Sequence, residues 1–224
     1  MGDMIGKFHY NAAFFTRYAP FFEAAQALPP DATVLVIGAN DGILADPSNH
    51  VWQDGWTGVF VEPNPYVVEK LKRNRAGLVI QKAVSNEPGK LHLYTMTPDA
   101  AAAYEKVGAN GTALTSSCRE HIESRIRKNM PDTMNTMGLE NMIERIEVEC
   151  VPVRDLKVKP DLIQIDIEGM EQAVVPDCLD LGAKIVLWEH QHLNDAEKGK
   201  LEALARGKGY TTRRLRNDSM AVMT

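Results

Sequence analysis

The sequence has few cysteines, no long apolar run and no excess of positive charge. Its three cysteines, Cys118, Cys150 and Cys178, show no CxxC spacing, which argues against a disulfide framework or a zinc knuckle and favours reduced thiols. No stretch approaches the ~18 apolar residues of a membrane span, and the first residues lack the pattern of a signal peptide. We therefore expect a soluble, cytoplasmic protein without a membrane partner.

The net charge is −5, because 30 Asp and Glu residues outnumber 25 Lys and Arg residues. An acidic total argues against a nucleic-acid partner, because a phosphate backbone binds basic surfaces. The composition, 44% hydrophobic and 25% charged, is ordinary for a globular protein and excludes collagen-like, coiled-coil and wholly disordered classes. The length predicts one domain over residues 1–224 with an insertion, and a homo-oligomer stays open.

Apolar segments along the chain alternate between strand-like and helix-like patterns. The segments typical of buried parallel strands are 33–37, 58–62, 78–80, 161–167 and 184–188. Helical spacing fills the gaps between them, and the tail resembles a hairpin of two strands. This order predicts an α/β protein with a doubly wound, Rossmann-like sheet and an antiparallel last strand at its edge.

Two further segments lie outside this alternation. Residues 1–30 are predicted to be an N-terminal helical segment, because apolar residues recur there every three or four positions, with a break at Pro20. The polar, helix-like stretch 97–145 is inserted between the third and fourth core strands. Insertions over the carboxyl ends of strands commonly carry function, so we expect 97–145 to be a helical lid that binds substrate.

The ends of the first two strands carry groups suited to a nucleoside. Ligands of doubly wound sheets bind outside the carboxyl ends of the strands. Gly38 and Gly42 allow a tight turn through Asn40 and Asp41. Glu62 ends the second strand 24 positions after Gly38, close to the ~20-residue spacing at which an acid binds ribose hydroxyls. The pattern favours a nucleoside cofactor.

The loop between Gly38 and Gly42 also discriminates among cofactors. A dinucleotide requires the G-x-G-x-x-G turn for its pyrophosphate, but the middle glycine is replaced by Asn40, and Asp41 adds negative charge. S-adenosylmethionine has cationic ammonium and sulfonium groups and no phosphate, so an acidic loop suits it. A nicotinamide-dependent oxidoreductase and a non-catalytic nucleoside-cofactor-binding protein are the alternatives.

Four ordered motifs resemble those of a known family. They lie at residues 37–42, 62–65, 83–89 and 161–169. In this order they resemble the signatures of the FkbM-type S-adenosylmethionine-dependent methyltransferases, over about residues 31–192. The resemblance implies a class I methyltransferase fold with a seven-stranded sheet, and O-methylation of a small acceptor such as a sugar or a natural product.

The resemblance also implies roles for individual residues. The glycine loop would line the methionine end of the cofactor, Glu62 would hold the ribose, and Ala83 and Val84 would flank the adenine. Asp166 would lie beside the methyl-transfer centre, and we expect Asp46 near the cofactor's amino group. The complete set of predicted cofactor-binding residues is Gly38, Asn40, Asp41, Gly42, Asp46, Glu62, Asn64, Ala83, Val84 and Asp166.

Methyl transfer to a hydroxyl also requires a group that takes the proton. We predict Asp166, Glu168 and His190 as catalytic residues, with Glu189 and His192 as further candidates. Alternation along an extended strand would place His190 and His192 on one face, and His190 is the favoured base because a neutral imidazole accepts protons near neutral pH. Asp166, Glu168 and His190 could instead bind a divalent ion such as Mg²⁺, so a metal requirement stays undetermined.

Polar residues of the insertion could contact a hydroxylated acceptor. They are Thr112, Thr115, Ser116, Ser117, Arg119 and His121. The charged run over 119–128 is interpreted as a solvated helix face. The identity of the acceptor does not follow from these residues.

Overall fold

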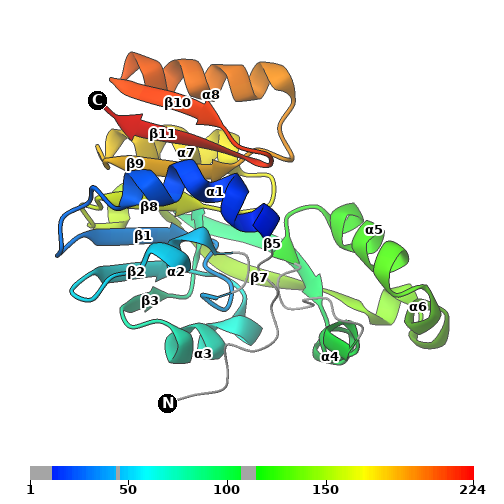
Figure 1. The fold of residues 1–224 in the computed structure, drawn as a ribbon. Coiled ribbons are helices and arrows are strands. Elements are labelled where there is room, and N and C mark those ends of the chain that lie inside the picture. The colour runs from blue at the N-terminus through cyan, green and yellow to red at the C-terminus, as the bar shows by residue number, and fades with distance from the viewer. Residues whose placement is uncertain (1–11, 44–45, 107–114) are drawn as a thin grey trace.

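The structure is a computed structural model that describes residues 12–43, 46–106 and 115–224. Thr112 therefore lies outside the described residues. Within the described part the strands form two sheets, one of seven strands and one of four (Figure 1). The larger sheet carries the motifs at 37–42, 62–65 and 161–169, and the smaller sheet carries the motif at 83–89 and supports the insertion.

The seven-stranded sheet has the order β10-β11-β9-β8-β1-β2-β3. Its strands are β1 (Thr33–Ile37), β2 (Thr57–Val61), β3 (Leu78–Ile80), β8 (Leu162–Ile165), β9 (Ile185–Glu189), β10 (Tyr210–Arg214) and β11 (Asp218–Met223). β1 pairs in parallel with β2 and β8, whereas β11 is antiparallel to both β9 and β10. The structure therefore confirms the doubly wound α/β sheet with an antiparallel last strand.

Helices cover both faces of this sheet, which explains why β1 is an unbroken apolar run. Leu35 and Ile37 pack with α7 and α8 on one face, and Val34 and Val36 pack with α1 and α3 on the other. All four side chains are fully buried. The covering helices are α1 (Ala12–Ala25), α2 (Pro47–Val51), α3 (Pro65–Asn74), α7 (Glu171–Asp180) and α8 (Asp195–Gly207).

Helix α1 continues through Pro20, so the predicted break at this residue is wrong. Proline removes one helical hydrogen bond, but tertiary packing offsets this loss. Phe21 is fully buried against the sheet, and the Tyr18 hydroxyl donates to Asp218 Oδ2 at 2.8 Å. Burial of the apolar face of α1 therefore holds the helix together.

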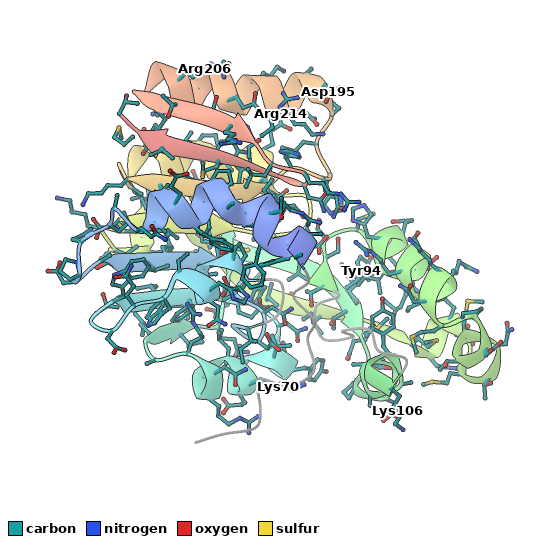
Figure 2. The ribbon with its side chains drawn as sticks, viewed as in Figure 1. Lys70, Tyr94, Lys106, Asp195, Arg206 and Arg214 are labelled. Carbon is teal, nitrogen blue, oxygen red and sulfur yellow. The ribbon has the colours of Figure 1, made fainter. Side chains whose placement is uncertain are left out.

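The outer edge of the large sheet is tied to helix α8. Arg214 on β10 donates from Nε to Glu202 Oε1 at 2.5 Å. Its Nη1 also lies 3.9 Å from Asp195 Oδ1, near the start of α8, and Figure 2 shows both side chains at this edge. Charged side chains of this kind protect an edge strand from pairing with other chains.

The second sheet has the order β4-β7-β5-β6. Its strands are β4 (Ala83–Ser85), β5 (Gly89–Met96), β6 (Thr115–Ser116) and β7 (Ile143–Pro152). β5 and β7 pair antiparallel along their length, and this long hairpin carries the insertion away from the large sheet (Figure 1). The sequence did not predict that these strands form a sheet of their own.

The described part of 97–145 is mostly helical and surrounds a separate apolar cluster that includes Tyr104, Ile122 and Ile126. Its helices are α4 (Pro98–Lys106), α5 (Arg119–Asn129), α6 (Pro131–Met137) and the short 3₁₀ turn η2 (Leu139–Asn141). A second 3₁₀ turn, η3 (Val153–Leu156), follows β7. Over the described residues, we find no helix whose length and apolar character would allow it to cross a membrane.

Candidate active site

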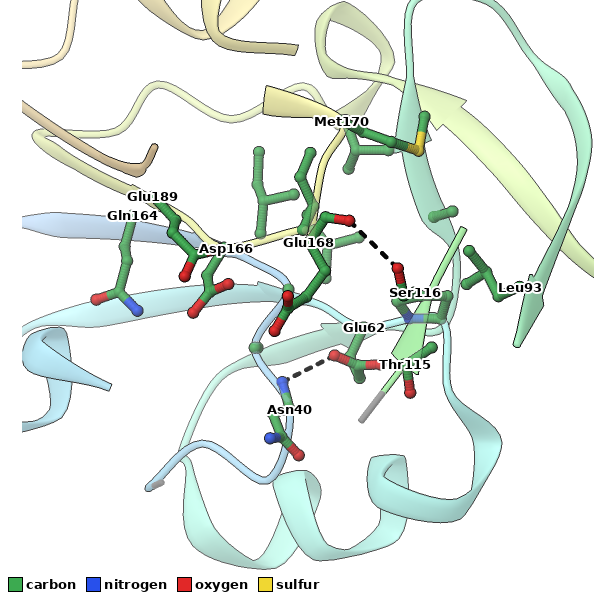
Figure 3. Close-up of a pocket in the computed structure, with 18 of the residues that line it drawn as sticks. Asn40, Glu62, Leu93, Thr115, Ser116, Gln164, Asp166, Glu168, Met170 and Glu189 are labelled. Carbon is green, nitrogen blue, oxygen red and sulfur yellow. Dashed lines mark hydrogen bonds between the residues drawn. The ribbon is translucent and has the colours of Figure 1, made fainter. Parts of the chain in front are cut away.

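A cavity of about 360 Å³ lies at the carboxyl ends of β1, β2 and β8. This volume falls in the range of small-molecule sites, about 300–1,000 Å³. One part of its wall comes from the large sheet and another from the insertion, as Figure 3 shows for Glu62 and Ser116. The predicted residues that line it are Gly38, Asn40, Asp46, Glu62, Ala83, Val84, Thr115, Ser116, Asp166, Glu168 and Glu189.

The loop after β1 requires glycine at its first position. Gly38 has φ +78°, and a Cβ at this residue would lie 1.7 Å from the carbonyl oxygen of Asp166. The Gly38 N–H donates to the Val61 carbonyl at 2.9 Å, and the Asn40 N–H donates to Glu62 Oε2 at 2.8 Å. The end of β2 therefore holds the loop at the cavity.

Glu62 is a buried acid with both oxygens aligned by the backbone. Oε2 accepts from the Asn40 N–H and Oε1 accepts from the Asn64 N–H, each at 2.8 Å. Burial raises the pKa of Glu62 to about 7, against the opposing effect of these two hydrogen bonds. Each carboxylate oxygen retains a lone pair, so Glu62 can accept further hydrogen bonds from a ligand.

The cavity wall formed by the described residues does not include Asp41, Gly42, Asn64 or His190. Asp41 accepts from the N–H of Ile43 within its own loop. Gly42 packs against α3, where a Cβ would lie 2.4 Å from Cγ of Arg75. Both residues shape the loop from outside the cavity.

Asn64 connects the large sheet to the insertion. Its Oδ1 caps α3 by accepting from the N–H of Tyr66 at 2.9 Å. Its Nδ2 donates to Thr115 Oγ1 at 2.8 Å and to Thr95 Oγ1 at 3.2 Å. The contact with Thr115 depends on the second sheet, so the sequence could not predict it.

Asp46 presents a carboxylate oxygen at the cavity wall. It caps α2 and accepts from the Ser48 hydroxyl at 2.6 Å. Its Oδ2 lies 3.9 Å from Arg75 Nη1 and has no hydrogen-bond partner among the described residues. The Arg75 guanidinium carbon lies 4.4 Å from the ring centroid of Trp52 and 4.8 Å from that of Phe60. Burial raises the pKa of Asp46, and Arg75 opposes this shift.

Asp166, Glu168 and Glu189 form an acidic cluster at the ends of β8 and β9 (Figure 3). One oxygen of each lies within 4.8 Å of the others. Desolvation and the charge of Glu168 raise the pKa of Asp166, and burial together with Asp166 raises the pKa of Glu189 to about 10. Oε2 of Glu189 has no hydrogen-bond partner among the described residues. Such a cluster would stabilise a bound cation.

The turn after β8 places Glu168 in an unusual backbone conformation. Glu168 has φ +54°, a region that non-glycine residues rarely occupy. Glu171 holds the turn, because its carboxylate accepts from the N–H groups of Ile167 and Gly169 at 3.1 and 3.0 Å. Local strain of this kind often accompanies functional sites.

A second cavity of about 100 Å³ shares Glu168 with the first and is also lined by His121 and His192. His192 Nε2 lies 2.8 Å from Glu168 Oε2 and 3.5 Å from Glu189 Oε2. The hydrogen bond to Glu168 raises the pKa of His192. The rings of His121 and His192 are 4.4 Å apart between centroids.

His190 does not share a face with His192, so this prediction is wrong. Strand β9 ends at Glu189, and the alternation of a strand stops there. His190 is buried elsewhere, with Nδ1 2.9 Å from Ser219 Oγ, and burial lowers its pKa. The described geometry thus brings Glu189, rather than His190, to Asp166 and Glu168.

Several residues of the cavity wall were not predicted. Gln164 lies within the apolar strand β8, and its Oε1 accepts from the Ser48 N–H at 2.9 Å. The sequence signal that could have identified Gln164 was a polar residue inside an apolar run. Arg125, within the charged run of α5, and Lys82 also line the cavity, and no sequence pattern pointed to either.

The cavity wall fits a cationic nucleoside cofactor. Its carboxylates outnumber its cationic side chains, Lys82 and Arg125. Three buried acceptor atoms of residues in this wall have no hydrogen-bond partner among the described residues, namely Asn40 Oδ1, Asp46 Oδ2 and Glu189 Oε2. The ammonium and sulfonium groups of S-adenosylmethionine supply positive charge, and its hydroxyls supply hydrogen-bond donors, so the residues present suit this cofactor.

Several solved structures resemble the chain over most of its length. The ribosomal protein L11 methylase of Lactobacillus delbrueckii subsp. bulgaricus has 11% identity and a TM-score of 0.46, covering 96% of this chain and 79% of its own. The precorrin-6y C5,15-methyltransferase of Geobacter metallireducens has 10% identity and a TM-score of 0.42, with coverages of 91% and 84%. Aeropyrum pernix fibrillarin, in complex with S-adenosyl-L-methionine, has 12% identity and a TM-score of 0.41, with coverages of 90% and 73%.

The sequence itself provides the family. Comparison with curated proteins gives no match. The pattern of the methyltransferase FkbM domain, however, matches residues 37–213. This match includes the glycine loop, Glu62 and the acidic cluster. The chain therefore belongs to the FkbM family of S-adenosylmethionine-dependent methyltransferases.

Proposed function

We propose that this methyltransferase acts on a hydroxyl group of a small acceptor, either a sugar or a natural product. The observation that carries the proposal is the acidic cluster of Asp166, Glu168 and Glu189 at the cavity wall. A hydroxyl must lose its proton when it is methylated, and a carboxylate in hydrogen-bond reach can take that proton. S-adenosylmethionine, when bound, supplies the methyl group on a positively charged sulfur.

In this proposal residues of both sheets bind the cofactor. Glu62 accepts hydrogen bonds from the ribose hydroxyls, while Ala83 and Val84 flank the adenine. Gly38 and Asp46 border the methionine end. The support for these roles is that all five residues line one cavity and that Asp46 retains an oxygen without a hydrogen bond among the described residues.

The insertion at 97–145 contacts the acceptor. It contributes Tyr104, Thr115, Ser116 and Arg125 to the same cavity as the cofactor residues. Hydroxyl and guanidinium groups suit a polyhydroxylated molecule, because each can donate to its oxygens. The insertion thus acts as the lid and substrate wall of a single domain.

Asp166 and Glu189 act together as the proton acceptor. Both lie in the cluster where desolvation, followed by the charge of neighbouring carboxylates, raises the pKa and favours proton uptake. The positive charge of the bound cofactor would lower these raised pKa values, so that the pair is ionised and can accept the proton. Glu168, which was also predicted to be catalytic, holds His192 at the rim.

A methyl-transfer assay with labelled S-adenosylmethionine tests the proposal. The acceptors are a panel of sugars and phenols, each paired with the analogue in which an amine replaces the hydroxyl. We expect transfer to hydroxyls. Asp166→Asn and Glu189→Gln should each lower kcat about 10²- to 10⁴-fold, while calorimetry shows S-adenosylhomocysteine bound within about threefold of the wild-type affinity.

Glu87→Gln is the matched control, because Glu87 is exposed and pairs with Arg154 on the surface. It should retain wild-type kcat. Transfer confined to the amine analogues would contradict the proposal, and so would full activity in both Asp166→Asn and Glu189→Gln.

A further inference from the structure

Two histidines and a glutamate from three separate elements converge beside the acidic cluster. His121 belongs to α5 of the insertion, Glu168 follows β8, and His192 follows β9. One ring nitrogen or carboxylate oxygen of each residue lies within 4.8 Å of the other two. The proton-accepting pair described above, Asp166 and Glu189, includes none of the three.

We propose that His121, His192 and Glu168 bind a divalent first-row transition metal ion. Two imidazoles and one carboxylate are a ligand set typical of such ions, whereas Mg²⁺ and Ca²⁺ prefer oxygen ligands alone. Metal–ligand bonds of about 2.0–2.2 Å place two ligands of one ion at most ~4.4 Å apart. The observed separations, within 4.8 Å, need only a small contraction.

An independent observation supports a cation at this point. Glu189 is 8% exposed, and its Oε2 lacks a hydrogen-bond partner among the described residues. This oxygen lies 3.5 Å from the same His192 nitrogen that Glu168 approaches at 2.8 Å. Two carboxylates thus converge on one imidazole, and a divalent ion would neutralise the surplus negative charge.

The surroundings of His121 fit a metal ligand as well. Ser116 Oγ lies 3.4 Å from His121 Nδ1, which leaves Nε2 for the ion. A ligating histidine is commonly oriented by a hydrogen bond at its other nitrogen. Ser116 also lies 3.4 Å from the carbonyl oxygen of Glu168, so one hydroxyl is near two of the proposed ligands.

The position of the site gives the ion two roles. It would join the insertion to the large sheet, because His121 and Glu168 come from different parts of the fold.

The second role concerns the acceptor. Glu168 and Ser116 line both cavities, so an acceptor hydroxyl could become a further ligand, and metal ions lower the pKa of bound hydroxyls. Its proton would pass to the Asp166–Glu189 pair, and its oxygen would bond to the methyl carbon as the carbon–sulfur bond breaks. This second role rests on the proposed function, whereas metal binding does not.

Titration of the metal-free protein tests the site directly. After dialysis against EDTA and removal of the chelator, calorimetry and thermal melting follow the addition of Zn²⁺, Mn²⁺, Co²⁺ or Mg²⁺. We expect about one equivalent of a transition metal to bind and to raise the melting temperature, with no effect of Mg²⁺ at the same concentration. Bound Co²⁺ should also show an altered visible spectrum.

Variants identify the ligands. His121→Ala and His192→Ala should each weaken binding by about 100-fold or more and abolish the Co²⁺ spectral change. His92→Ala is the matched control, because His92 is exposed on β5 beside Glu147, and it should bind metal as the wild type does. Melting in EDTA shows whether each variant is folded, and His121→Asn and His192→Asn replace any alanine variant that is not.

The outcomes separate the site from the proposed function. Absence of binding, equal binding of Mg²⁺, or unchanged affinity in His121→Ala and His192→Ala would overturn the metal site. Metal binding without methyl transfer to any hydroxyl would support the site and contradict the proposed function. If the protein binds metal but transfers methyl groups at the full rate in EDTA, the ion has no catalytic role. Its role in joining the insertion to the large sheet would remain.

Discussion

The two sheets of this protein differ in how much of each face is buried. Strand β1 of the large sheet is buried on both faces. Strand β7 of the second sheet alternates between buried and exposed residues. A sheet that is covered on both sides holds its strand ends rigidly, as a cofactor site requires, whereas a half-exposed sheet depends on fewer apolar contacts.

The acidic side chains of the two sheets also differ in burial and in hydrogen bonding. Glu147 and Glu149 on β7 are exposed and pair with Lys90 and Lys82, and exposed pairs of this kind add little stability. Glu189, which ends β9, is buried and has an oxygen without a hydrogen-bond partner among the described residues. Burial of an acid with an oxygen that accepts no hydrogen bond destabilises the fold, so its presence at the carboxyl end of β9 points to a role in ligand binding.

The largest effect is expected from a single methyl group in the glycine loop. Gly38→Ala places a Cβ against the Asp166 carbonyl at a residue with φ +78°, so we expect a loss of more than about 3 kcal/mol in unfolding free energy and no binding of S-adenosylhomocysteine. Gly89→Ala in the second sheet meets no atom within 4 Å and should change stability by less than about 1 kcal/mol. Denaturant unfolding and calorimetry measure both.

Equal stability of these two variants would show that the loop after β1 can move away from Asp166. The large sheet would then tolerate substitution at Gly38 as well as the second sheet does at Gly89.

An intermediate effect is expected in the apolar cluster of the insertion. Ile126 of α5 is fully buried in the cluster that includes residues of α4 and the end of β5, so Ile126→Ala should cost about 2–5 kcal/mol through the cavity it leaves. We expect faster amide hydrogen exchange throughout α5 and little change in β1, with S-adenosylhomocysteine affinity largely retained. Lys128→Ala, at an exposed position of the same helix, should leave exchange unchanged. Equal acceleration in β1 and α5 would show that both regions unfold as one unit.

The smallest effect concerns the pH dependence of the large sheet. The pKa of Glu62 is raised from 4.5 to about 7 by burial, so the folded state binds its proton more tightly than the unfolded state does. The resulting stability is fully present below about pH 4.5 and is lost as pH rises through about 7, a loss of up to about 3 kcal/mol. Glu62→Gln should lack this component in denaturant unfolding of the cofactor-free protein.

Glu147→Gln, which changes an exposed acid of the second sheet, should follow the pH dependence of the wild type. If the free energy of unfolding changed with pH in the same way for the wild type and for Glu62→Gln, Glu62 would keep its ordinary pKa in the folded protein.

Local patterns in the sequence were sufficient to predict the large sheet and part of the cavity wall. The apolar run of β1 predicts a strand buried on both faces, because only a two-sided cover can shield it from water. The spacing from Gly38 to Glu62 spans one strand–helix–strand unit, so it brings these residues together in any sheet of this kind. Both residues do line the cavity.

Packing between distant segments decided the rest. β9 ends at Glu189, so its carboxylate joins the cavity wall while His190 turns to Ser219. His121 meets Glu168 and His192 only because the start of α5 lies beside the carboxyl ends of β8 and β9. Spacing along the chain determines which residues share a strand or a turn, whereas the meeting of side chains from different elements depends on how whole sheets pack, and that is set by the tertiary structure.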